Sequence, residues 1–187
     1  AATPISKSVG KELDRFFNPE SKFFGNPSST HAEGSLARNI LEEARLSIAR
    51  NLQVHKDEVV FTSGATESNN IIILGTYEAS LKKIKNPHII TSSIDHSAIL
   101  EPIRALEKKG CKVDYVNPSD RKLVPVDEIS RLLNKDTILI SLSLVNSELG
   151  TIAQIRDVSR AIAVFKKKNN RSYNDYPYLH MDASQAT

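Results

Sequence analysis

The sequence predicts an α/β fold of three layers, in which helices cover both faces of a mostly parallel, doubly wound sheet. Two observations support this fold class. Short apolar runs alternate with amphipathic segments from residue 58 to the end of the chain, which is the pattern of repeated strand–helix units. The run 137–145 is apolar enough to be a central strand buried on both faces. With 187 residues, 40% of them hydrophobic, the chain can form a single domain with a sizeable core.

The individual elements follow from local patterns. Strands are expected where short apolar runs end in turn residues, and helices where apolar residues recur every three or four positions. Gly110 is placed to end the helix before it, and Pro125 to open a short helix. The expected strands are 58–62, 88–92, 112–116, 137–145 and 178–182, and the expected helices are 35–51, 66–82, 97–109, 125–133 and 155–167.

Composition excludes several classes of protein. Lys and Arg number 25 against 22 acidic residues, and this balance is too slight to predict nucleic acid or a membrane surface as a partner. The one local excess, 166–168 with Arg171, is interpreted as a solvated helix end. A single cysteine excludes an internal disulfide framework, and no apolar run approaches the ~20 residues of a membrane span. The N-terminus does not resemble a signal peptide, so the cytoplasm is the expected location.

The turn at Gly64 predicts a site for an anion. An apolar run ends there and a helix begins at once behind it, so unpaired amides of the first turn, including those of Ala65 and Thr66, point the same way. The hydroxyls of Ser63 and Thr66 add two donors. An ordinary capped turn is the alternative. A nucleotide P-loop fits less well, because that motif needs a Lys-Ser/Thr pair after its second glycine, and here Thr66 is followed by Glu67.

Other polar residues follow the later strands, where ligands bind in such sheets. His96 follows the strand at 88–92, and Asp182 and Gln185 follow the last strand. A phosphate site, an imidazole, a carboxylate and an amide together suit pyridoxal phosphate, whose ring nitrogen needs a carboxylate to remain protonated. Each residue also has a simpler explanation as a cap or a surface group. A metal site from His96, His180 and Asp182 is not predicted, because no ligand pair at helical spacing supports it.

Five motifs, in this order, resemble the class V aminotransferase-type cysteine desulfurases. They are 25–31 (GNPSSTH), 61–69 (FTSGATESN), 95–96 (DH), 145–151 (VNSELGT) and 180–185 (HMDASQ). The resemblance covers almost the whole chain. It implies the incomplete large domain of a fold-type I pyridoxal phosphate enzyme, without the C-terminal small domain. The family is homodimeric, takes sulfur from L-cysteine, releases L-alanine and passes a persulfide to acceptor proteins of iron–sulfur cluster or thio-cofactor synthesis.

The resemblance also implies roles for individual residues. Ala65 and Thr66 would hold the cofactor phosphate. His96 would stack on the pyridine ring and act in acid/base steps. Asp182 would pair with the pyridine nitrogen, and Gln185 would hydrogen-bond the ring hydroxyl.

The sequence departs from the family at one of these positions. The family usually has two asparagines before the glutamate of the fourth motif, and the second touches the ring hydroxyl. Here Ser147 takes that place after Asn146. A serine reaches less far, so the contact could pass through Ser147, through water or through Asn146.

Two catalytic groups of the family have no counterpart in these residues. The Schiff-base lysine and the persulfide-forming cysteine would both lie beyond Thr187, and no lysine follows Asp182. Cys111 is interpreted as a structural thiol. We therefore expect a fragment that is inactive alone. A selenocysteine lyase, another class V transaminase and a non-catalytic binding module are the alternatives.

Overall fold

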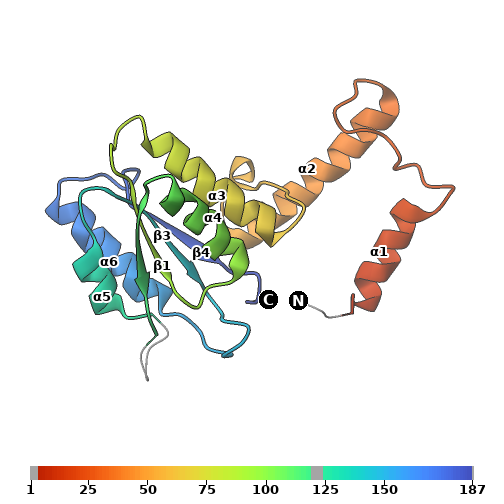
Figure 1. Ribbon diagram of the computed structural model, residues 1–187. Helices are drawn as coiled ribbons and strands as arrows, with labels where there is room; N and C mark the ends of the chain where they lie inside the picture. The colour runs from red at the N-terminus through yellow and green to blue at the C-terminus, as the bar shows by residue number, and fades with distance from the viewer. Residues whose placement is uncertain (1–3, 119–123, 187) are drawn as a thin grey trace. The chain divides into compact units, whose positions relative to one another are not determined.

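The computed structural model describes residues 4–118 and 124–186 (Figure 1). The chain divides into two compact units, one up to Phe61 and one from Thr62 onward. Each unit is described by itself below. None of the helices that lie in the described ranges is long and apolar enough to cross a membrane.

The first unit contains two helices and a short 3₁₀ turn. Helix α1 spans Lys7–Phe17, α2 spans Ala32–Leu52, and η1 spans Lys56–Glu58. Helix α2 confirms the amphipathic helix expected at 35–51, whereas α1 was not expected from the pattern. No residue of α1 is buried.

The loop that leads into α2 lies against the start of that helix, backbone against backbone. A Cβ atom at Gly25 would overlap the carbonyl oxygen of Glu33, and one at Gly34 would lie 2.7 Å from that of Asn26. Arg38 donates hydrogen bonds to the carbonyls of Pro27 and Ser29. These close approaches require glycine, and they explain why the motif 25–31 begins with one.

The prediction of a strand at 58–62 is wrong. No strand forms in this segment. Residues 56–58 form η1 instead, because the His55 ring accepts from the amide of Asp57 and the Glu58 carboxylate accepts from the amide of His55, which closes a capping box. The carbonyl of Val59, which a sheet would need, accepts from the Arg45 guanidinium. Val60 is 71% exposed, so the apolar run is not a buried strand within this unit.

The second unit contains a four-stranded, fully parallel sheet. Its strands are β1 (His88–Ser92), β2 (Lys112–Val116), β3 (Thr137–Ser143) and β4 (Tyr178–Asp182), in the order β2-β1-β3-β4. The chain moves outward from β1 to β2 and then crosses over β1 to form β3 and β4. The sheet is therefore doubly wound, as expected, and the winding direction reverses between β1 and β3.

Helices cover both faces of this sheet, which confirms the three-layer architecture (Figure 1). The helices are α3 (Ala65–Ser80), α4 (Ser97–Lys108), α5 (Val126–Leu132) and α6 (Ile155–Lys168). Helices α3 and α4 pack on one face around Ile89 and Leu139, and α5 and α6 pack on the other around Ile90 and Ile140. Alternate residues of β1 and β3 thus supply the two halves of the core, and β3 is buried from Thr137 to Leu142. Gly110 has a φ of 96° just after α4, which confirms that it ends that helix.

Candidate functional site

The winding reversal between β1 and β3 creates the crevice in which such sheets bind ligands. Asp95 lies between the ends of β1 and β3 and is only 7% exposed. One carboxylate oxygen accepts from the amide of Ser143 at 3.0 Å. The other accepts from the amide of Ser92 and the hydroxyl of Thr91, both at 3.2 Å. Asp95 therefore joins the carboxyl ends of β1 and β3.

Burial raises the pKa of Asp95, and the hydrogen bonds from Ser143, Ser92 and Thr91 oppose this rise. Among the described residues, no cation forms an ion pair with it. Its three hydrogen bonds thus stabilise the buried carboxylate in place of a counter-ion.

His96 is the N-cap of α4. Its Nδ1 accepts from the amide of Ala98 at 3.1 Å, so in the neutral ring the proton is on Nε2. The ring itself is exposed beside the end of β1. The capping role is confirmed, and it leaves one ring face and Nε2 accessible for a ligand.

Asn146 and Ser147 follow β3 and have different environments. The side chain of Asn146 is buried and donates to the carbonyl of Ile94 at 3.0 Å, while its oxygen accepts from the amides of Glu148 and Leu149. It therefore joins the loop after β3 to the loop after β1. Ser147 is exposed, so its hydroxyl is the accessible group of the pair.

Asp182 ends β4 beside Ser143, its partner in the parallel register. Its carboxylate accepts from Nδ2 of Asn69 at 2.8 Å and from the amide of Ser184 at 2.9 Å, as well as from the Ser184 hydroxyl. Partial burial acts to raise its pKa, but these hydrogen bonds and the nearby His180 together lower it. Asp182 is therefore a fixed anion at neutral pH.

The start of α3 lies near Asp182, because Asn69 is on the first turns of that helix. Gly64 is the N-cap, has a φ of 154°, and offers no side chain to the first-turn amides. Ala65 and Thr66 are exposed there. The Glu67 carboxylate accepts from the amide of Ser63, so that amide is already used.

The remaining candidate residues are only partly integrated in the site. Gln185 is exposed and makes no side-chain hydrogen bond within the described part of the chain. Nδ1 of His180 lies 2.9 Å from the Ser141 hydroxyl, and burial lowers the pKa of His180 against the opposing effect of Asp182. His180 is thus a packed residue behind Asp182, as expected. Across residues 4–118 and 124–186, no group of three His, Cys, Asp or Glu residues could hold a metal ion.

The arrangement fits pyridoxal phosphate chemically. The open first turn of α3 can accept an anionic phosphate, and the exposed His96 ring can stack on a flat heterocycle. Asp182 is held as an anion, which is the state needed to keep a pyridine nitrogen protonated. All three groups lie at the carboxyl edge of one sheet.

Two residues of the site were not singled out from the sequence. Asp95 and Asn69 are within the quoted motifs, but each is a polar residue next to a more conspicuous neighbour. The signal that could have found them is their position: one directly follows a buried strand, and the other is one helical turn after Thr66. Both position other groups rather than face the crevice.

The fold and the crevice agree with the family that the sequence matches. Residues 1–186 match the aminotransferase class-V family, and the chain belongs to it.

Individual relatives show which members of this family the chain is similar to. The chain is 44% identical over 186 residues to the cysteine desulfurase IscS of Dictyoglomus turgidum, covering 99% of this chain and 43% of the relative. It is 33% identical to a mitosomal cysteine desulfurase of Trachipleistophora hominis, covering 99% of this chain and 39% of that protein. The chain thus spans less than half the length of these relatives.

Solved structures give the same result. A NifS-like protein is similar with a TM-score of 0.85 and 38% identity, over 97% of this chain and 46% of that one. SspA in complex with cysteine is similar with a TM-score of 0.82 and 34% identity, over 98% of this chain and 49% of that one. The fold is therefore that of the cysteine desulfurases.

Proposed function

We propose that this chain is the cofactor-binding part of a pyridoxal phosphate-dependent cysteine desulfurase. The observation that carries the proposal is the fixed anion Asp182, held by Asn69 beside the open first turn of α3. Relatives named cysteine desulfurases, with 33 to 44% identity over nearly the whole chain, give the substrate class. L-cysteine would be converted to L-alanine and the sulfur passed to an acceptor protein, for iron–sulfur clusters or thio-cofactors, by a cytoplasmic homodimer.

Six positions would hold the cofactor, and one of them, His96, stacks its ring on the pyridine ring. The amides of Ala65 and Thr66 and the Thr66 hydroxyl bind its phosphate, and Asp182 binds its ring nitrogen. Ser147 and Gln185, both exposed, supply donors for the ring hydroxyl. Ser147 rather than Asn146 is assigned here, because three hydrogen bonds already engage Asn146.

When bound, pyridoxal phosphate supplies an electron sink for carbanion chemistry on an amino acid. This chain's residues orient the ring and move protons. The capped Nδ1 of His96 fixes the ring so that Nε2 is the atom that gives and accepts the proton. Asp95, just before it, keeps the loop in place through its hydrogen bonds to β3.

The proposal is tested by direct titration of the protein with pyridoxal phosphate, followed by absorbance and by fluorescence anisotropy. Asp182→Asn removes the charge and keeps the shape, so we expect the Kd to rise about tenfold to a hundredfold, as for loss of a charge-assisted hydrogen bond. Thr66→Ala should raise it by about fivefold through one lost hydrogen bond. For these 187 residues alone we expect binding without release of sulfide from cysteine.

Matched controls separate the site from general effects. Asp157→Asn makes the same Asp-to-Asn change on α6, where the carboxylate pairs with the Arg160 guanidinium. Thr76→Ala makes the same Thr-to-Ala change further along α3. Both should leave the Kd unchanged. Equal losses in a variant and its control would mean that the site is misplaced. A stable fold that shows no cofactor-dependent spectrum would favour a non-catalytic binding module instead.

A further inference from the structure

A groove lies at the opposite edge of the sheet, where the strands begin. We call it the amino-edge groove. Its polar lining includes Lys83, Lys135, Asp136, Arg171, Asp175 and Tyr178. It is remote in the fold from the carboxyl ends of the strands, so nothing in the cofactor site accounts for it.

The wall of the groove is held rigid by its own hydrogen bonds. The Arg171 guanidinium donates to the carbonyl of Lys135 at 2.7 Å and to that of Tyr176 at 3.0 Å, across 36 residues of sequence in the first case. Lys166 donates from Nζ to the carbonyl of Tyr173 at 2.8 Å. The polar loop 169–177 is therefore fixed in one conformation. A preformed surface of this kind loses little conformational entropy when a partner binds.

The lining of the groove contains three cationic side chains and two carboxylates, so its charge is slightly positive. Within the described residues, neither Lys83 nor Lys135 makes an ion pair or a side-chain hydrogen bond. Further exposed lysines are Lys82 and Lys85, next to Lys83 in sequence, and Lys167 and Lys168 at the end of α6. The Asp175 carboxylate accepts from the amide and the hydroxyl of Ser172. These hydrogen bonds lower its pKa, and the nearby Lys83 and Lys166 lower it further, so Asp175 offsets part of the charge of Lys83.

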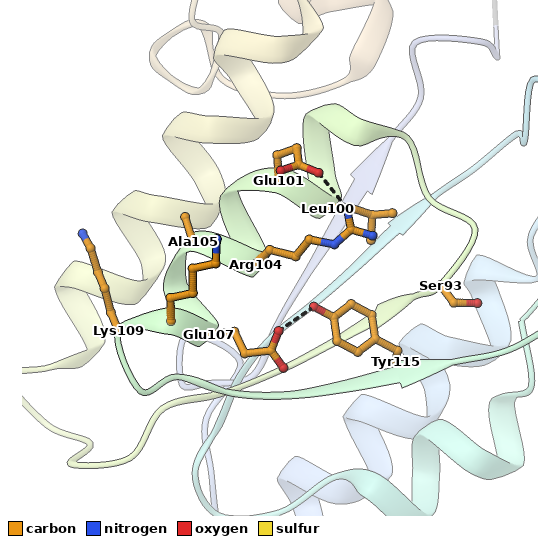
Figure 2. A pocket seen from close by; sticks show the side chains of 9 residues that line it. Ser93, Leu100, Glu101, Arg104, Ala105, Glu107, Lys109 and Tyr115 are labelled. Atoms are coloured by element: carbon orange, nitrogen blue, oxygen red, sulfur yellow. Dashed lines mark hydrogen bonds and ion pairs between the residues drawn. The ribbon is translucent and has the colours of Figure 1, made fainter.

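A second pocket, between α4 and β2, shows the contrasting case (Figure 2). There Arg104 pairs with Glu101 at 2.6 Å, and the Tyr115 hydroxyl donates to Glu107 at 3.1 Å. The carboxylates of Glu101 and Glu107 thus already accept from these two donor side chains. Lys109 lies at its rim with an exposed side chain (Figure 2). This pocket offers a matched control rather than a site.

An exposed aromatic ring borders the amino-edge groove. Tyr173 is 92% exposed, and Nζ of Lys166 lies 5.7 Å from the centre of its ring and 5.7 Å from that of Tyr178. Tyrosine and arginine on a fixed loop are typical of the residues that anchor protein partners. The free lysines around them favour an acidic partner.

We propose that the amino-edge groove docks an acidic segment of a partner protein. Asp136 and Asp175 within the lining favour a polypeptide over a nucleic acid, because every unit of a phosphodiester backbone is anionic and would meet these carboxylates. A polypeptide can place an amide or a cation opposite them. The sequence alone favoured a solvated helix end at 166–168, and the fixed loop and the free cations are what the structure adds.

The test is fluorescence anisotropy of the whole chain with a fluorescein-labelled peptide of twelve residues rich in Asp and Glu. Lys83→Ala with Lys135→Ala should weaken binding about three- to tenfold, the range of two exposed ion pairs. Tyr173→Ala should weaken it about threefold or more, whereas Tyr173→Phe should not. The control pair Lys108→Ala with Lys109→Ala removes the same charge at the other pocket and should leave binding unchanged. Circular dichroism checks that each variant is folded.

Other outcomes would overturn the proposal. An equal loss in the control pair would mean that binding follows net charge alone. Tighter binding of a single-stranded oligonucleotide of the same charge would assign the groove to nucleic acid instead. No measurable binding of the acidic peptide at low ionic strength would leave the groove without this partner. None of these results bears on cofactor binding, which is measured separately at the carboxyl edge.

Discussion

His88 is a buried histidine whose protonation state is set by its neighbours. Its side chain is 1% exposed. Nδ1 lies 2.9 Å from both the Thr137 hydroxyl and Nδ2 of Asn134, and Nε2 lies 3.0 Å from the Asp114 carboxylate. The Asn134 oxygen accepts from the amide of Asp136, so the NH₂ end of Asn134 faces the ring and Nδ1 must accept. The ring is therefore neutral, with its proton on Nε2.

This geometry predicts an acid-sensitive stability. Burial lowers the pKa of His88, and nearby Lys112 acts in the same direction, whereas Asp114 and Asp136 oppose them. Above pH ~6.5 neither the folded nor the unfolded chain carries the proton. As the pH falls below that value the unfolded chain binds a proton first, so the free energy of unfolding decreases until the lowered folded pKa is reached. His180 contributes with the same sign.

Urea denaturation at pH 7.5 and at steps down to pH 5 measures this dependence. His88→Gln should lower stability at neutral pH but flatten the decline, leaving the part due to His180. If the variant and the parent protein lost stability in parallel, His88 would not be the titrating group.

Asp95 predicts a second effect at the scale of one residue. Asp95→Ala leaves the amides of Ser92 and Ser143 without their acceptor in a buried place, at a cost of about 3 kcal/mol in the free energy of unfolding. Asp95→Asn keeps one acceptor oxygen and should cost about 1 to 2 kcal/mol. Chemical denaturation measures both, and the exposed Asp157→Asn should change stability by less than about 0.5 kcal/mol. If Asp95→Ala left the free energy of unfolding unchanged, β1 and β3 would not need this link.

At the scale of an element, α3 contains two glycines with opposite expected effects. Gly64 has a φ of 154° and Gly75 is in the helix interior, and in both cases an added Cβ would meet no atom within 4 Å. Gly64→Ala should destabilise by about 1 to 3 kcal/mol, because the backbone conformation excludes other residues. Gly75→Ala should stabilise by about 0.5 to 1 kcal/mol through helix propensity. Thermal denaturation of the pair measures both signs, and a stabilising Gly64→Ala would contradict the backbone described here.

The elements of the second unit could be predicted because each has a strong local signal. The strands 88–92 and 112–116 agree with β1 and β2 at both ends. The prediction for 58–62 failed because its apolar residues suggested a strand. Hydrogen bonds of His55, Arg45 and Glu58 determine the backbone conformation there instead. The periodicity of the sequence does not reveal such contacts. Helix α1 was missed although its apolar residues Val9, Leu13 and Phe16 recur at helical spacing.

The candidate site was predictable to a similar degree. The residues that would face a ligand, such as His96 and Asp182, follow strands and were found by that rule. The residues that hold them were not found, because Asn69 and Asp182 are 113 positions apart. Only the folded chain brings such partners together. The roles of all the proposed ligand-binding residues stay predictions, those of Ala65, Thr66, His96, Ser147, Asp182 and Gln185.

At the scale of the whole molecule, the buried residues are distributed unevenly between the two units. In the first unit Gly34 and Ala49 are the buried residues within its helices, whereas β1 and β3 of the second are buried along almost their whole length. Hydrogen exchange measured by mass spectrometry should therefore show α1 exchanging fastest and β3 slowest. Slow exchange throughout α1 would mean that a surface not described here covers that helix.

The buried thiol of Cys111 can report local opening of the sheet. It is the one cysteine of the chain, its thiol donates to the carbonyl of Pro87 at 3.2 Å, and burial and the nearby Glu107 raise its pKa to about 12. A thiol reagent at pH 8 can therefore react only with molecules whose sheet has opened at the start of β2. The labelling rate then counts those molecules directly, without a probe being added to the protein. The same single thiol, which takes no part in the proposed chemistry, would make ligand-induced stabilisation of either edge of the sheet measurable in one assay.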